Sequence, residues 1–98
     1  MKGEYKFNEI LDLDIHWTAW KVRTKKGDPV VNLIYMEDGD EFMVYEPMGK
    51  KYVAAGGGCI PRDSDINGDM LDAAIDTMIR SITGLKKWKV DVIGTNDV

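Results

Sequence analysis

Residues 18–55 alternate apolar and polar side chains in short runs that are separated by glycine-containing turns. In residues 18–24, for example, Trp20 and Val22 alternate with Lys21 and Arg23. A period of two places successive side chains on opposite faces of an extended chain, so such a run predicts a half-buried strand. Strands joined by tight turns pair with their neighbours in antiparallel order. This segment therefore restricts the chain to folds built on an antiparallel sheet.

Four strands are predicted in this segment, and the turn residues indicate where each one ends. The strands are expected at residues 18–24, 30–36, 41–46 and 51–55. Residues 26–29 and 47–50 have turn compositions. The pair Asp38-Gly39 is a strong hairpin signal and predicts a turn in which both residues have positive φ. Glycines 56–58 are expected to end the fourth strand.

The clearest helix is predicted at about residues 68–83. Apolar side chains recur there every three or four residues, at Leu71, Ala74, Ile75, Met78, Ile79 and Ile82. This spacing forms one apolar stripe along a helix. Gly84 follows at the position where a left-handed C-terminal cap is expected.

The remaining segments complete the predicted fold. Residues 88–94 alternate again and predict a fifth strand, and residues 7–13 fit either a short helix capped by Asn8 or an irregular lead-in. A chain of 98 residues is expected to form a single domain, 1–98. The predicted fold class is α+β: an antiparallel meander of four to five strands with the main helix packed on one face, and a short N-terminal helix as an open alternative.

Charge and composition argue against several classes of function. The net charge of −4 disfavours non-specific binding to nucleic acid, which requires an excess of basic residues. Three small groups of basic residues are interpreted as solvated charges near turns and strand ends: Lys21, Arg23, Lys25 and Lys26; Lys50 and Lys51; Lys86, Lys87 and Lys89. Most of the nine aromatic residues are expected in the core.

The residue composition also constrains where the protein is located and whether it is an enzyme. No apolar run approaches the roughly 18–20 residues that span a bilayer, so a cytoplasmic location without a membrane partner is expected. Cys59 and His16 are the single residues of their types, which excludes the common zinc sites and a histidine-based triad. Cys59 is expected to be a small buried residue beside its glycines. Since no phosphate-binding glycine loop is present either, an enzyme is not expected.

Residues 63–76 contain five aspartates and no basic residue, and part of this segment fits a calcium-binding loop. When the loop is read from its first aspartate, positions 1, 3, 5 and 6 of an EF-hand hold Asp63, Asp65, Asn67 and Gly68. Position 12, which normally supplies a bidentate carboxylate, is Ala74. Read from the second aspartate, the segment resembles the calcium loop of dockerin modules, with Asp65, Asn67, Asp69 and Asp76 at positions 1, 3, 5 and 12.

This second register also departs from its family, because position 6 is Met70 and dockerins carry two such loops. The candidate calcium ligands are therefore Asp63, Asp65, Asn67, Asp69 and Asp76, and no other cofactor is expected. The alternative is a helix start, in which Asp65 or Asn67 caps the helix and Asp69 and Asp72 stabilise its positive end.

Four of these aspartates also recur at helical spacing and would form an acidic stripe beside the apolar one. They are Asp65, Asp69, Asp72 and Asp76. Such a face could bind a basic surface of a protein partner. The main hypothesis is therefore a small acidic, non-enzymatic binding or regulatory protein, of the kind that phages and mobile elements use to inhibit host proteins. A weak calcium-binding module is an alternative.

A nucleic-acid-binding module is the other alternative. If residues 7–13 are helical, the order of one helix, three strands and a helix resembles that of double-stranded RNA-binding domains, in which a glycine-rich approach to the last helix also recurs. The resemblance implies an RNA-binding role. That family places a lysine cluster at the start of the last helix, whereas this chain has Asp69 and Asp72 there. The charge therefore disfavours nucleic acid as a partner.

Overall fold

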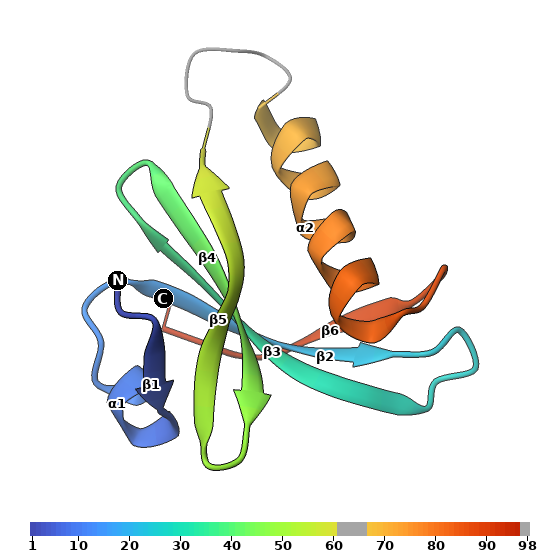
Figure 1. Ribbon diagram of the computed structural model, residues 1–98, viewed down its shortest axis with the longest axis horizontal. Helices are drawn as coiled ribbons and strands as arrows, with labels where there is room; N and C mark the ends of the chain where they lie inside the picture. Colours follow the sequence, from blue (N-terminus) through green and yellow to red (C-terminus); the bar gives the residue numbers. More distant parts are fainter. Residues whose placement is uncertain (61–66, 97–98) are drawn as a thin grey trace.

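The computed structural model describes the backbone of residues 1–60 and 67–96, and the side chains of these residues except 67–69. Along this part of the chain the elements are β1 (Glu4–Lys6), α1 (Phe7–Leu11), β2 (His16–Arg23), β3 (Pro29–Asp38), β4 (Glu41–Met48), β5 (Lys51–Cys59), α2 (Asn67–Thr83) and β6 (Lys89–Thr95). The strands form one antiparallel sheet in the order β1-β5-β4-β3-β2-β6 (Figure 1). The predicted α+β class is confirmed, with β2 to β5 as the meander.

The N-terminal segment adds one strand to the prediction and forms the short helix that was one of its alternatives. β1 pairs with β5, and α1 confirms the short helix. Asn8 does not cap this helix but lies inside it, and Lys6 is the capping residue. The backbone N–H of Lys6 donates to Oε1 of Glu9 at 2.8 Å. This hydrogen bond, followed by the contact with Lys2, lowers the pKa of Glu9.

The β3–β4 and β4–β5 hairpins of the meander share one type of turn. Asp38 pairs with Glu41, so the first turn is Gly39-Asp40 and not the predicted Asp38-Gly39. Gly39 has φ 63°, and among the described residues positive φ occurs at glycines alone. A positive φ at the first central residue is the feature of type II′ turns, which match the twist of paired strands. The second hairpin repeats this arrangement with Gly49 at φ 64°.

The glycines at 56–58 do not end the fourth strand, because β5 continues through them to Cys59. They allow close approach of neighbouring atoms instead. A Cβ atom at Gly56 would lie 3.3 Å from the sulfur of Met78 on α2, and one at Gly57 would lie 2.3 Å from the carbonyl oxygen of Phe42 on β4. Cys59 follows them and is exposed, contrary to the expectation that it is buried.

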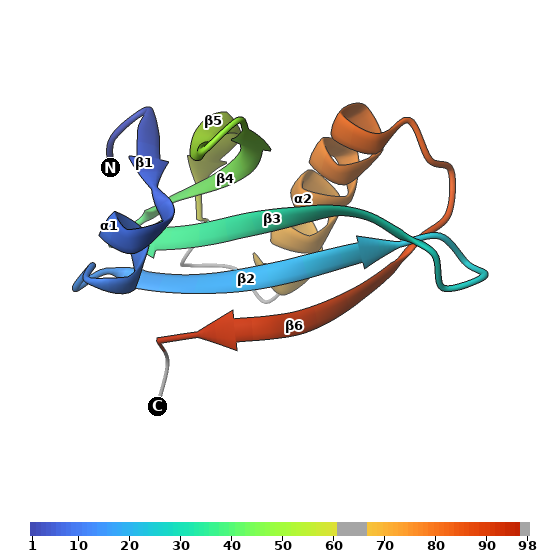
Figure 2. The same cartoon turned by 90° about the horizontal axis from the view of Figure 1, so that it is seen from below.

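Alternate residues of each strand point to opposite faces of the sheet, so apolar side chains lie on both faces. Each face is packed against one of the two helices. On one face, α1 packs Ile10 into a cluster with Tyr5, Trp17, Ala19, Ile34, Met36 and Tyr45. On the other, α2 contributes its predicted apolar stripe to a cluster with Val22, Leu33, Tyr35, Phe42 and Val44. Most aromatic residues belong to these clusters, as predicted. The β4–β5 hairpin has α1 and β1 on one side of it and α2 on the other (Figures 1 and 2).

Candidate functional site: a cationic cavity beside Trp88

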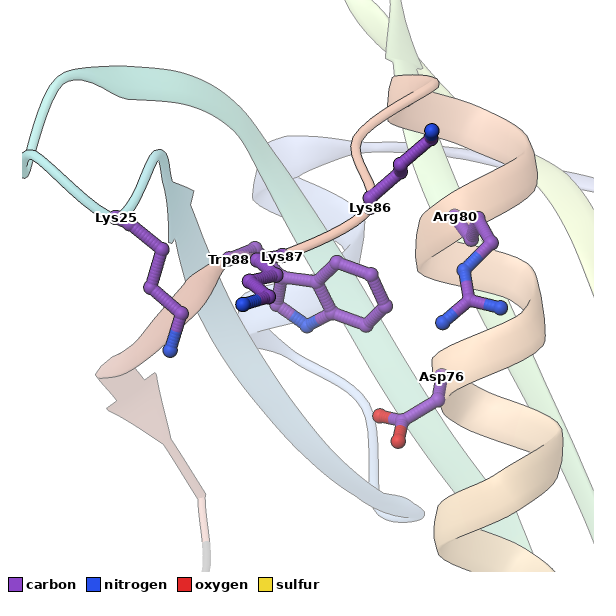
Figure 3. Close-up of a pocket in the computed structure, with 6 residues that line it drawn as sticks. All are labelled: Lys25, Asp76, Arg80, Lys86, Lys87 and Trp88. Atoms are coloured by element: carbon purple, nitrogen blue, oxygen red, sulfur yellow. The ribbon is translucent and has the colours of Figure 1, made fainter.

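An open hollow lies between the C-terminal half of α2, the loop that follows it, and the loop between β2 and β3. It has a volume of about 510 Å³. Its lining residues are Lys25, Asp76, Arg80, Lys86, Lys87 and Trp88 (Figure 3). Two segments that are distant in sequence, the turn at Lys25 and residues 76–88, therefore bring four basic side chains and one tryptophan to the same hollow.

The end of α2 sets the position of two sides of this cavity. Gly84 has φ 72° and its N–H donates to the carbonyl oxygen of Arg80 at 2.8 Å, which is the predicted left-handed cap. The chain then turns back to Trp88, whose partly buried ring packs on the core cluster beneath α2. Arg80 lies in the last turn of the helix, where a positive charge is favourable.

Lys25 is held at the cavity by an ordered turn between β2 and β3. The N–H of Gly27 donates to the carbonyl of Thr24 and the N–H of Thr24 donates to the carbonyl of Asp28, both at 2.9 Å. Nη1 of Arg23 also donates to the carbonyl of Gly27 at 3.0 Å. The turn that carries Lys25 is thus closed by hydrogen bonds from both of its ends.

Positive charge dominates the cavity, although the whole chain carries −4. The guanidinium carbon of Arg80 lies 5.7 Å from the centre of the Trp88 ring, within the range of a cation–π contact. Figure 3 shows Arg80 and Asp76 on α2 directed toward this ring, with Lys25 and Lys87 on its other side. Among the described residues, no carboxylate forms an ion pair with the four basic side chains. An anionic ligand would therefore meet cations that no described carboxylate neutralises by direct contact.

The residues of the predicted acidic stripe are only partly described. Asp72 and Asp76 are exposed on α2, whereas Asp65 lies outside the described residues and the side chain of Asp69 is not described. Asp76 lines the cationic cavity, so the end of the stripe lies beside positive charge. The stripe as a partner-binding face stays a prediction.

The calcium hypothesis falls on the same segment. Asp63 and Asp65 lie outside the described residues, and Asn67 and Asp69 are described in their backbone only, within α2. In the described part of the chain, no three His, Cys, Asp or Glu side chains form a group that could hold a metal ion. The calcium loop therefore stays a prediction.

Sequence reasoning assigned the lysines of the cavity to separate solvated groups, and it did not include Arg80. The structure places Lys25 of the first group beside Lys86 and Lys87 of the third. The available signal was Trp88, a large aromatic residue flanked by lysines on a predicted strand end. Its neighbours across space depend on the turn at Gly84 and on the β2–β6 pairing, which periodicity does not reveal.

Neither the helices nor a comparison with known proteins indicates a function for this site. Within the described residues, neither helix has the length and apolar character needed to cross a membrane. Function has to be argued from the geometry of the site, because a fold alone does not specify one. Comparison of the chain with protein-family models, with curated proteins and with solved structures gives no match.

Proposed function

We propose that this chain is a non-enzymatic binding protein that holds an acidic segment of a protein partner in the cationic cavity. The supporting observation is that four basic side chains line one hollow together with Trp88. A single exposed ion pair contributes only about 0.2–1 kcal/mol, so several cations at one place are needed for useful affinity. Arginine and tryptophan are also the residues that most often dominate binding energies at protein interfaces.

An acidic protein segment suits this cavity better than nucleic acid does. The basic side chains occupy one local hollow, and the chain as a whole has more Asp and Glu than Lys and Arg. The net charge of −4 repels a long nucleic acid strand more strongly than a short acidic peptide, because the strand carries more negative charge along its length. The proposal therefore keeps a protein as the partner and disfavours RNA or DNA.

Replacement of Arg80 by glutamine is expected to weaken binding of a fluorescein-labelled deca-glutamate peptide by about fivefold to tenfold. The change removes one charge-assisted hydrogen-bond donor and the cation next to Trp88. Fluorescence anisotropy at low and at physiological salt measures the affinity, which should fall as salt screens the charges. An oligo-dT strand of equal charge serves as the competing probe.

Two adjacent lysines provide a matched control for this experiment. Lys25 lines the cavity and Lys26 does not, although both are exposed in the same turn. Lys25→Gln should weaken peptide binding by about threefold, whereas Lys26→Gln should leave it nearly unchanged. Equal effects of the two substitutions, or tighter binding of oligo-dT than of the peptide, would contradict the proposal.

The acidic stripe is a second candidate surface, and the exposure of Asp72 and Asp76 favours it. Its partner would be a basic protein, as for a phage or mobile-element product that inhibits a host protein. Asp72→Asn separates the two surfaces, because Asp72 does not line the cavity. If this variant loses binding to a deca-lysine peptide, the acidic stripe is supported as a partner-binding surface. If the cavity is the site, binding of the deca-glutamate peptide is expected to stay unchanged.

A further inference from the structure

Strand β6 has one paired edge and one unpaired edge among the strands that the structure describes. It pairs with β2 alone and is the last strand of the sheet (Figure 2). Its register with β2 is regular from Lys89 to Val92, and a bulge follows at Ile93. An edge strand presents free N–H and C=O groups that can pair with another strand.

The side chains of this regular stretch are apolar on one face and charged on the other. Val90 and Val92 are 40% and 63% exposed, although they lie opposite Val22 and Trp20 on the face that α2 covers elsewhere. Lys89 and Asp91 alternate with them and point to the opposite face. The edge thus combines open backbone groups, exposed valines and a pair of opposite charges.

We propose that β6 pairs in antiparallel order with β6 of a second copy of the chain, about a two-fold axis at Val90. In this register Lys89 of each copy lies opposite Asp91 of the other, so two oppositely charged pairs form across the interface. Val90 meets its own counterpart, and Val92 meets position 88 of the second copy, which is occupied by Trp88. A surface that is complementary to itself in this way gives a closed dimer.

The charges select this register over its neighbours. Paired residues of antiparallel strands point to the same face, so the axis has to pass through a residue of β6. An axis at Lys89 would place two lysines opposite each other, and an axis at Asp91 would do the same with two aspartates. Like charges directly opposite each other are destabilising. The axis at Val90 avoids both and also covers the exposed valines.

Charge reversal at the two positions tests the register. Lys89→Asp places two carboxylates opposite each other in each cross-strand pair, and Asp91→Lys places two ammonium groups opposite each other. Each single variant is expected to dimerise at least about tenfold more weakly than the natural chain. The double variant restores opposite charges in both pairs and should regain dimerisation. In an equimolar mixture of the two single variants, a dimer of unlike copies has an acidic side chain opposite a basic one in both pairs, so mixing is expected to restore dimerisation.

Sedimentation equilibrium up to about 1 mM protein suits this measurement, since a single strand pairing buries less surface than the roughly 800 Å² per partner of a stable interface. Circular dichroism of each variant verifies the fold, because Asp91 also forms an exposed ion pair with Arg23 at 2.8 Å. A natural chain that is monomeric throughout this range overturns the proposal. Dimers that persist in both single variants overturn it as well, and failure of the peptide-binding experiment does not affect either result.

Discussion

Replacement of Gly57 by alanine is expected to lower the free energy of unfolding by about 3 kcal/mol. The new Cβ would lie 2.3 Å from the carbonyl oxygen of Phe42 and 2.9 Å from the sulfur of Met43. Of these two neighbours, the carbonyl belongs to the backbone of β4, so it can move away only if the pairing of β4 and β5 changes. Chemical denaturation followed by circular dichroism measures the loss.

Gly56→Ala is the matched control for this prediction. Its Cβ would meet the sulfur of Met78 at 3.3 Å, and this atom belongs to a flexible side chain that can adjust. The expected change in unfolding free energy is within about 1 kcal/mol, because the Met78 side chain can shift by a few tenths of an ångström. If the two variants were equally stable, the close approach of β4 at Gly57 would not be a constraint on the fold.

Stability is also expected to fall by about 2–3 kcal/mol between pH 10 and pH 12, chiefly because of Tyr45. Its side chain is 0% exposed, and burial, followed by the neighbouring Tyr5, raises its pKa to about 12. The unfolded chain releases this proton near pH 10, whereas the folded chain retains it until about pH 12. Rising pH therefore favours the unfolded state in this interval, and burial raises the pKa of Tyr52 in the same direction.

Tyr45→Phe separates this titration from other effects of alkaline solution. The hydroxyl of Tyr45 donates to the carbonyl oxygen of Lys2 at 2.6 Å, so its removal should cost about 1 kcal/mol at pH 7. The variant should then lose less stability than the natural chain between pH 10 and pH 12. Urea denaturation at a series of pH values gives both results. An equally steep alkaline loss in the variant would show that other groups control it.

The elements with strong local signals could be predicted from the sequence. The stripe from Leu71 to Ile82 predicted α2 to within one residue at its start, and Gly84 predicted its end. The alternating runs predicted β2 to β5 in their correct order. β1 could not be predicted, because a strand of three residues has no period of its own and depends on its pairing with β5.

The glycines at 56–58 were predicted wrongly for a physical reason. Glycine commonly ends a strand, but it also occurs inside strands where another backbone approaches closely. The two cases differ only in the neighbours, here Phe42 on β4 and Met78 on α2. The same limit applied to the first hairpin, where the pairing of Asp38 with Glu41 moved the turn by one residue.

The sequence by itself determined the fold class, the meander and the helix, because hydrophobic periodicity and turn residues act over a few positions. It also determined the excess of acidic residues, and with it the expectation of a protein partner. Only the tertiary structure decided that Lys25, Arg80 and Lys87 surround Trp88, and that β6 is an edge. Charges separated by more than 50 residues meet only after the chain has folded, so no local pattern records their proximity.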